Sequence, residues 1–140
     1  MKLAAGKYVI ADPCYVLDYD TYDRLLSETD YFMMNSVDRG GVMVDKQSGK
    51  FFAVFSTKYG DGLYRDGKGF KYGVDAGCIA CIPVEMWDKG QDNEYINEVT
   101  FAKDFEVRYE DGLIIFGDVI INTDPDDFYE EEEESYEDVA

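Results

Sequence analysis

The feature that most restricts how this chain folds is a series of short apolar runs separated by turn residues. Lys7–Ala11 (KYVIA) reads as a strand that ends at Asp12-Pro13, because proline lacks the backbone donor that a sheet needs. Val42–Val44 and Phe51–Phe55 flank a turn and predict a hairpin. Runs of this length, rich in β-branched and aromatic residues, favour strands. The body of the chain is therefore expected to be mainly β.

A second hairpin is predicted nearer the C-terminus. Thr100–Tyr109 and Leu113–Asn122 lie on either side of Glu110-Asp111-Gly112, the strongest turn signal in the sequence. Further strands are expected at Tyr31–Val37 and within Val74–Val84. The glycine- and charge-rich stretch Lys58–Gly73 reads as a long loop or as a pair of loose strands. Together these runs predict six to eight short strands.

One short helix is expected near residues 20–29. Asp20 is the predicted N-cap, and Asp23, three residues later, resembles a capping box. Tyr22, Leu25 and Leu26 would share the apolar face of this helix. The predicted fold is an antiparallel sandwich or partly open barrel, mainly β or α+β with little helix, in which the helix covers one end or edge.

The C-terminal run Asp124–Ala140 (DPDDFYEEEEESYEDVA) divides the chain into two parts. It holds ten of the 31 acidic residues and no Lys or Arg. Dense like charge predicts a segment that is disordered when free, so we expect one compact domain at 1–123 and an acidic-aromatic tail at 124–140. The rest of the chain has 21 acidic residues and 13 Lys and Arg, so it too is negatively charged, and the whole chain carries a net charge of −18. This charge disfavours nucleic acid and anionic membranes and favours basic partners.

Composition argues against several kinds of site. The chain has no His, which removes Ser-His-Asp and Cys-His catalysis and His-ligated metals. No apolar run approaches the roughly 18 residues of a membrane span, and the first residues do not read as a signal peptide. Three Cys without a disulfide framework fit a reducing compartment, so a cytoplasmic protein is expected. Cys78 and Cys81 have the spacing of a metal knuckle, but positions three apart on a strand face opposite ways, which predicts two buried thiols.

Three segments carry residues that a core does not require: DPCY at 12–15, GDGLY at 60–64 and VDAG at 74–77. Each places an Asp beside Gly or Pro at or near a predicted strand end, where β proteins commonly hold binding residues. The ligand-binding candidates are these acids and the polar side chains near them: Asp12, Cys14, Tyr15, Lys58, Asp61, Tyr64, Arg65 and Asp75.

The ordered set DPCYV, GDGLY and VDAG resembles a group of small uncharacterised proteins from phages and bacteria, over roughly residues 7 to 84. More loosely, it is similar to a bacterial domain of unknown function that carries a VDxG-type strand. The resemblance implies a phage-encoded protein in the host cytoplasm. It implies no activity.

Three interpretations of Asp12, Asp61 and Asp75 stay open. Converging carboxylates would hold Mg²⁺ or Ca²⁺ and support metal-assisted hydrolysis; no other cofactor is expected. With the remaining ligand-binding candidates, they would line a pocket for a small polar or nucleotide-like ligand. Alternatively, the Asp side chains cap turns through nearby backbone amides, and Cys14 and Tyr15 pack inward. Cys14 is a poor nucleophile candidate, because no His is present to lower its pKa.

The sequence favours a small acidic binding protein without catalytic activity. It would act by occupying a basic host or phage protein, as an inhibitor or nucleic-acid mimic. Aromatic residues interrupt the acidic tail, which suits a peptide that docks in a basic groove; the alternative is a tail that only aids solubility. The tail composition resembles the acidic C-termini of phage and bacterial single-stranded-DNA-binding proteins, although this domain lacks their basic binding face. The partner-binding candidates are Phe128, Tyr129, Glu130, Glu131, Glu132, Glu133, Glu134 and Tyr136. A small-ligand binder and a metal-dependent hydrolase are the alternatives.

Overall fold

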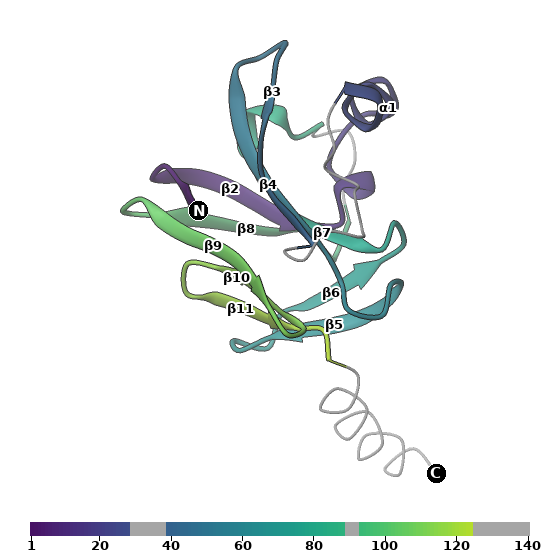
Figure 1. The fold of residues 1–140 in the computed structure, drawn as a ribbon, viewed down its shortest axis with the longest axis vertical. Helices are drawn as coiled ribbons and strands as arrows, with labels where there is room; N and C mark the ends of the chain where they lie inside the picture. The colour runs from purple at the N-terminus through teal and green to yellow at the C-terminus, as the bar shows by residue number, and fades with distance from the viewer. Residues whose placement is uncertain (29–38, 89–92, 125–140) are drawn as a thin grey trace, which may run out of the picture.

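The computed structural model describes residues 1–28, 39–88 and 93–124, which form two antiparallel β-sheets that do not close into a barrel (Figure 1). The six-stranded sheet has the order β1 (Lys2–Leu3), β9 (Phe105–Glu110), β10 (Leu113–Phe116), β11 (Val119–Asn122), β5 (Gly62–Asp66) and β6 (Lys71–Val74). The five-stranded sheet has the order β3 (Gly40–Asp45), β4 (Lys50–Ser56), β7 (Cys78–Pro83), β2 (Gly6–Ala11) and β8 (Asn97–Phe101). The mainly β fold predicted from the sequence is confirmed, with more and shorter strands than expected.

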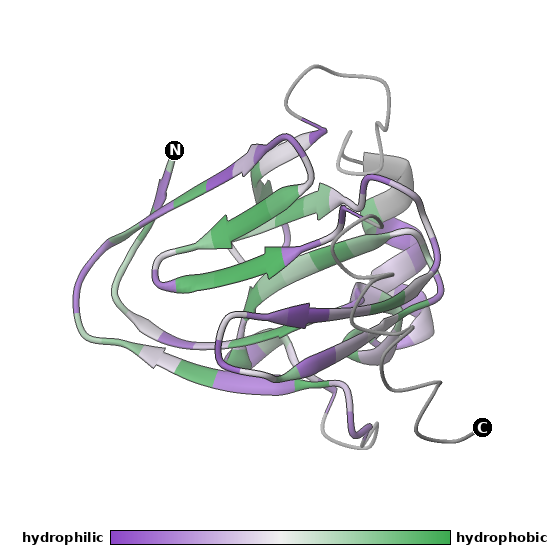
Figure 2. Ribbon diagram, turned by 90° about the horizontal axis from the view of Figure 1, so that it is seen from below, coloured by the Kyte–Doolittle hydropathy of each residue, from purple (hydrophilic) through white to green (hydrophobic). Residues whose placement is uncertain are grey.

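The five-stranded sheet is buried on both faces, because its strands alternate between two apolar clusters. Ile10, Phe55 and Ile79 point into the core between the two sheets. Val9 and Phe52 point the other way, toward the 3₁₀ turn η1 (Pro13–Tyr15) and the helix α1 (Tyr19–Glu28). Figure 2 shows the hydrophobic segments on the central strands and the hydrophilic ones on loops and outer strands. This two-sided burial explains the continuous apolar runs in the sequence.

Cys78 and Cys81 occupy opposite faces of β7, as their spacing predicts. Both side chains are fully buried, Cys78 in the cluster beneath α1 and Cys81 in the core between the sheets. Burial raises the pKa of both thiols well above the ordinary value. They act as small apolar side chains and do not form a shared metal site.

Both predicted hairpin turns form. Val42 pairs with Ala53 between β3 and β4, and Glu110 pairs with Leu113 across the two-residue turn Asp111-Gly112. Both of these turn residues have positive φ, 47° and 92°, which is the geometry of a type I′ turn. The sequence predicted one long strand on each side of Asp111-Gly112, and this is wrong, because each of them is divided into two strands. β8 and β9 belong to different sheets, and β10 turns into β11 at Gly117, where φ is 62°.

The stretch predicted as a loop or a strand pair is a hairpin of β5 and β6. Its turn is organised by the buried carboxylate of Asp66, which accepts hydrogen bonds from the amides of Lys68 at 2.9 Å and Phe70 at 3.0 Å. The Tyr72 hydroxyl donates to the same carboxylate at 2.7 Å. The strand predicted at Tyr31–Val37 lies outside the described residues.

Helix α1 begins two residues earlier than predicted, with Asp18 and not Asp20 as its N-cap. The Asp18 carboxylate accepts a hydrogen bond from the amide of Thr21 at 2.7 Å, and Asp20 lies in the first turn. Val16 and Leu17 are buried beneath the helix, so the chain leaves the core at Asp18. Leu25 is fully buried against the same cluster, as predicted, and Tyr22 packs at its edge. No helix among the described residues is long and apolar enough to cross a membrane.

A short 3₁₀ turn, η2 (Val84–Met86), follows β7 and leads toward Asp88. The Asp88 amide donates a hydrogen bond to the carbonyl of Val16 at 2.8 Å, which ties the end of this segment to the residues before α1. Asp88 therefore lies beside the start of the helix, although 70 positions separate it from Asp18 in the sequence.

Candidate functional site

The three segments singled out in the sequence lie together at one end of the sandwich. Asp12 follows β2, Asp75 follows β6, and Asp61 immediately precedes β5. The carboxylate of Asp12 bonds to the turn that contains Asp75 and Ala76. A Cβ placed on Gly77 in that turn would lie 4.0 Å from Oδ1 of Asp61. The three acidic positions are thus neighbours in the fold.

Asp12 is a structural clamp. Its side chain is fully buried, and Oδ2 accepts hydrogen bonds from the amides of Asp75 at 2.7 Å and Ala76 at 2.6 Å. Oδ1 accepts a third bond from the amide of Cys14 at 2.9 Å, which caps η1. Charge-assisted bonds of this kind are among the stronger ones in proteins. Here the bonds to Asp75 and Ala76 span 63 and 64 residues of sequence and so join two distant turns. Asp12 therefore matches the turn-capping alternative.

Asp75 is exposed and holds the ring of Tyr15. The Tyr15 hydroxyl donates a short hydrogen bond to Oδ2 of Asp75. This bond is the main reason why the pKa of Tyr15 is raised above its ordinary value, with burial adding to it. The phenol therefore stays protonated near neutral pH and acts as a donor. Tyr15 bridges η1 and the 75–77 turn on the outside, in parallel with the buried Asp12 clamp.

The acidic cluster does not have the form of a metal centre. Asp12 directs both carboxylate oxygens at backbone amides, so they are already engaged. In the parts of the chain that the structure describes, no group of three or more His, Cys, Asp or Glu side chains is placed to share a metal ion. The arrangement gives no geometric support to the metal interpretation of Asp12, Asp61 and Asp75.

Cys14 is partly buried beside this cluster, and its thiol is not activated. Burial is the main cause that raises the pKa of Cys14, and the neighbouring Asp12 and Asp75 carboxylates raise it further. A thiol with a raised pKa has little thiolate at neutral pH and is a poor nucleophile.

A hollow of about 350 Å³ lies next to Cys14 against the first turns of α1. We call it the acidic hollow; it is lined by Cys14, Leu17, Asp18, Tyr19, Tyr22 and Asp88. Two of these residues are acidic, two are tyrosines, and none is Lys or Arg. The Tyr19 side chain is 78 % exposed at its rim. Such a surface suits a cationic group, because carboxylates attract it and tyrosine rings give it a face to stack on.

Sequence reasoning did not identify Asp18, Tyr19, Tyr22 or Asp88 as binding residues. A usable signal was present for the two tyrosines, because residues three apart on a helix lie on the same side. Nothing local indicates Asp88, which reaches the hollow through the segment after η2.

Three more of the predicted ligand-binding residues serve other roles in the structure. Tyr64 is in the core between the sheets, only 4 % exposed, and its hydroxyl donates to the Gly60 carbonyl at 2.9 Å. The Lys58 ammonium lies 3.5 Å from carboxylate oxygens of both Asp111 and Asp124. Arg65 lies on β5 opposite Asn122 and Lys71 and lines a different hollow. The eight candidates therefore do not line one pocket. The predicted tail residues from Phe128 to Tyr136 lie outside the described residues.

Comparison of the chain with protein-family models, with curated proteins and with solved structures finds no match.

Proposed function

We propose that this protein is an acidic binding protein that docks on a Lys- or Arg-rich surface of another protein, as an inhibitor or nucleic-acid mimic. The observation that carries the proposal is the acidic hollow of about 350 Å³, which Asp18, Tyr19, Tyr22 and Asp88 line without any Lys or Arg. Tyr15 and Asp75 extend the same acid-and-aromatic chemistry on the neighbouring turn.

The overall charge supports the same type of partner. The net charge of −18 gives a long-range attraction to basic surfaces and repels phosphate backbones. The acidic-aromatic tail adds a second segment of the same character. A catalytic role gains no comparable support, because the Cys14 thiol has a raised pKa and the Asp12 carboxylate is engaged by three amides.

The test is a binding measurement with a matched pair of variants. The immobilised full chain is used at low salt to retain a protein from bacterial lysate, and the purified partner is then titrated. The triple variant D18N/Y19A/D88N removes two charges and one exposed tyrosine from the hollow, and asparagine preserves the helix cap. The control E94Q/Y59A/E98Q makes the same change elsewhere on the surface.

We expect affinity to fall about tenfold or more in the hollow variant, which corresponds to about 1.4 kcal/mol, and much less in the control. Affinity should also weaken as salt increases, because charge attraction is screened. Equal affinities for the two variants, or a partner bound equally well at high salt, would overturn the proposal.

A further inference from the structure

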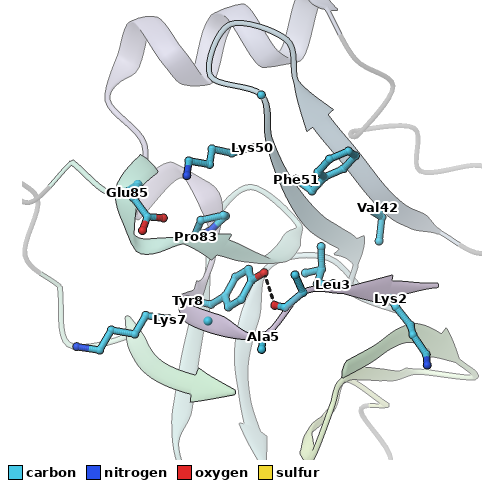
Figure 3. Close-up of a pocket in the computed structure, with 13 residues that line it drawn as sticks. Lys2, Leu3, Ala5, Lys7, Tyr8, Val42, Lys50, Phe51, Pro83 and Glu85 are labelled. Carbon is cyan, nitrogen blue, oxygen red and sulfur yellow. Dashed lines mark hydrogen bonds between the residues drawn. The ribbon is translucent and has the colours of Figure 1, made fainter. Parts of the chain in front are cut away.

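A second cavity, of about 530 Å³, lies between the start of the chain, β2 and β4 (Figure 3). We call it the lysine pocket after Lys2, Lys7 and Lys50, which line it with a largely apolar set of neighbours that includes Phe51 and Pro83. It is separate from the acidic hollow, and no lining residue is shared between the two. In a chain with a net charge of −18, a concentration of cations at one cavity is notable.

The charges at this pocket are not neutralised locally. Among the described residues, none of the three lysine ammonium groups has an ion-pair partner within 4.0 Å. Glu85 is the acidic residue in the lining. Two nearby acids are already engaged, since Glu106 pairs with the N-terminal amino group at 2.8 Å and Asp104 accepts the Ala5 amide at 3.0 Å. The pocket therefore keeps a local positive charge.

The arrangement of the lysines indicates the shape of the ligand. Figure 3 shows Lys2, Lys7 and Lys50 extending on different sides of the pocket, with Tyr8 and Pro83 between them. A single phosphate or carboxylate group would contact one of these lysines at a time. An extended segment with several negative charges would contact all three.

An exposed aromatic side chain at the pocket indicates a second property of the ligand, an apolar group. Phe51 on β4 is 58 % exposed at the pocket, although its neighbour Phe52 is buried. A partner ring would cover it and remove apolar surface from water. The chemistry that fits is thus an extended acidic peptide with aromatic residues.

The chain itself contains a segment of that description. Residues 126–136 (DDFYEEEEESY) combine seven acidic residues with Phe128, Tyr129 and Tyr136. The described chain ends at Asp124, beside Lys58 and the Asp111 turn at one end of β9. Lys2 lies at the other end of β9, opposite Glu106. Five residues of strand separate these ends, roughly 17 Å, and the residues after Asp124 can extend to roughly 50 Å.

We propose that residues 129–136 of this segment, which lie far enough from Asp124 to span roughly 17 Å, dock in the lysine pocket of their own chain. Their carboxylates lie against Lys2, Lys7 and Lys50, and a tail aromatic ring packs on Phe51. The short tether gives the tail a high effective concentration at the pocket, so weak contacts suffice to hold it. A basic partner that binds the tail must first displace it from the pocket. This interaction stands independently of the proposed function, because it concerns the free protein.

The experiment places a nitroxide spin label on the tail of the full chain and reads its distance-dependent broadening of backbone amide signals by NMR. The label is attached at S135C in a C14S background, because Cys78 and Cys81 are buried. Docking predicts broadening of amides at 6–8 and 49–51, strong at about 20 mM salt and lost at about 500 mM.

A matched pair of variants tests the lysines. K7Q/K50Q removes two charges from the pocket and should lower the broadening there about fivefold, whereas K68Q/K71Q removes two charges elsewhere and should leave it unchanged. Broadening confined to residues 58 and 111–112, near the start of the tail, would overturn the proposal. So would equal effects of the two variants.

A mixed sample distinguishes the chain's own tail from that of a second copy. It contains isotope-labelled chains without nitroxide and nitroxide-labelled chains without isotope. Own-chain docking predicts no broadening in this sample. Broadening at 6–8 and 49–51 would mean that the occupant comes from another molecule, and would overturn the proposal as stated.

Discussion

The backbone amide of Asp75 donates a hydrogen bond of 2.7 Å to Oδ2 of Asp12, whose side chain is fully buried. With the amides of Ala76 and Cys14, this bond fixes the turn after β6 against η1. The exposed Asp75 and Tyr15 side chains then meet on the outer side of the same junction. A buried acid thus sets the position of an exposed one.

We expect Asp12→Ala to lower the free energy of unfolding by about 3–5 kcal/mol, because three backbone amides lose one buried, charged acceptor together. Asp75→Ala, which removes only the exposed bond to Tyr15, should cost less than about 1 kcal/mol. Urea unfolding of both variants measures the difference. A stable Asp12→Ala protein, within about 1 kcal/mol of the wild type, would contradict the clamp.

The ion pair of Arg24 and Asp45 predicts a specific loss of stability in acid. The guanidinium Nη1 lies 2.7 Å from Oδ1 of Asp45, which is buried, and this contact is the main reason why the pKa of Asp45 is below its ordinary value of 3.8. A depressed folded-state pKa stabilises the fold above the unfolded value and loses that contribution as pH falls through the folded value. Arg24→Met should therefore cost about 1–3 kcal/mol at neutral pH and progressively less below about pH 4.

The control for this prediction is Lys68→Met, which breaks the pair with Asp118. The side chains of Lys68 and Asp118 are both largely exposed, so solvent screening weakens this pair. The expected loss in the free energy of unfolding is less than about 0.5 kcal/mol. Chemical denaturation at several pH values between 2 and 7 gives both differences. An Arg24→Met cost that does not change with pH would show that the ion pair is not responsible.

The strands and their turns were readable from the sequence because their causes are local. Val42–Val44, Phe51–Phe55 and the Asp111-Gly112 turn carry their own signals, and all three form. The last predicted strand is divided at Gly117-Asp118, a two-residue turn between Phe116 and Val119. A Gly-Asp pair between two apolar runs is itself a local hairpin signal, which the prediction of one continuous strand overlooked. The separation of β8 and β9 into different sheets was not readable, because it depends on pairing with strands far away in the sequence.

The candidate site shows a similar division between local and long-range causes. Asp12, Asp61 and Asp75 were identified by their positions at strand ends, and the structure brings them together. The direction of each side chain was not predictable, because Asp12 meets its partners across 63 residues of sequence. Asp88 reaches the acidic hollow through the long-range bond of its amide to Val16.

Truncation of two phenylalanines on β4 should destabilise the fold to very different extents. Phe55 is fully buried between the sheets, whereas Phe51 is 58 % exposed. Phe55→Ala should cost about 3–5 kcal/mol because it leaves a cavity, and Phe51→Ala less than about 1 kcal/mol. Thermal or urea unfolding of the two variants measures this. Similar losses at the two positions would mean that Phe51 is packed in the free protein much more tightly than its exposure indicates.

The Asp111-Gly112 turn provides a final test, which compares two glycines in turns. Gly112 has a φ of 92°, and an added Cβ would lie 3.3 Å from the Cβ of Asp124 and 3.4 Å from Cδ of Lys58. Gly112→Ala should therefore cost about 1–3 kcal/mol, from backbone strain and from the contacts that must shift. Gly67 is the matched control, because its φ is not positive and an added Cβ meets nothing within 4 Å. Gly67→Ala should change the free energy of unfolding by less than about 0.5 kcal/mol. A Gly112→Ala protein as stable as the Gly67→Ala protein would show that the turn tolerates a side chain, and the positive φ would then not explain the glycine.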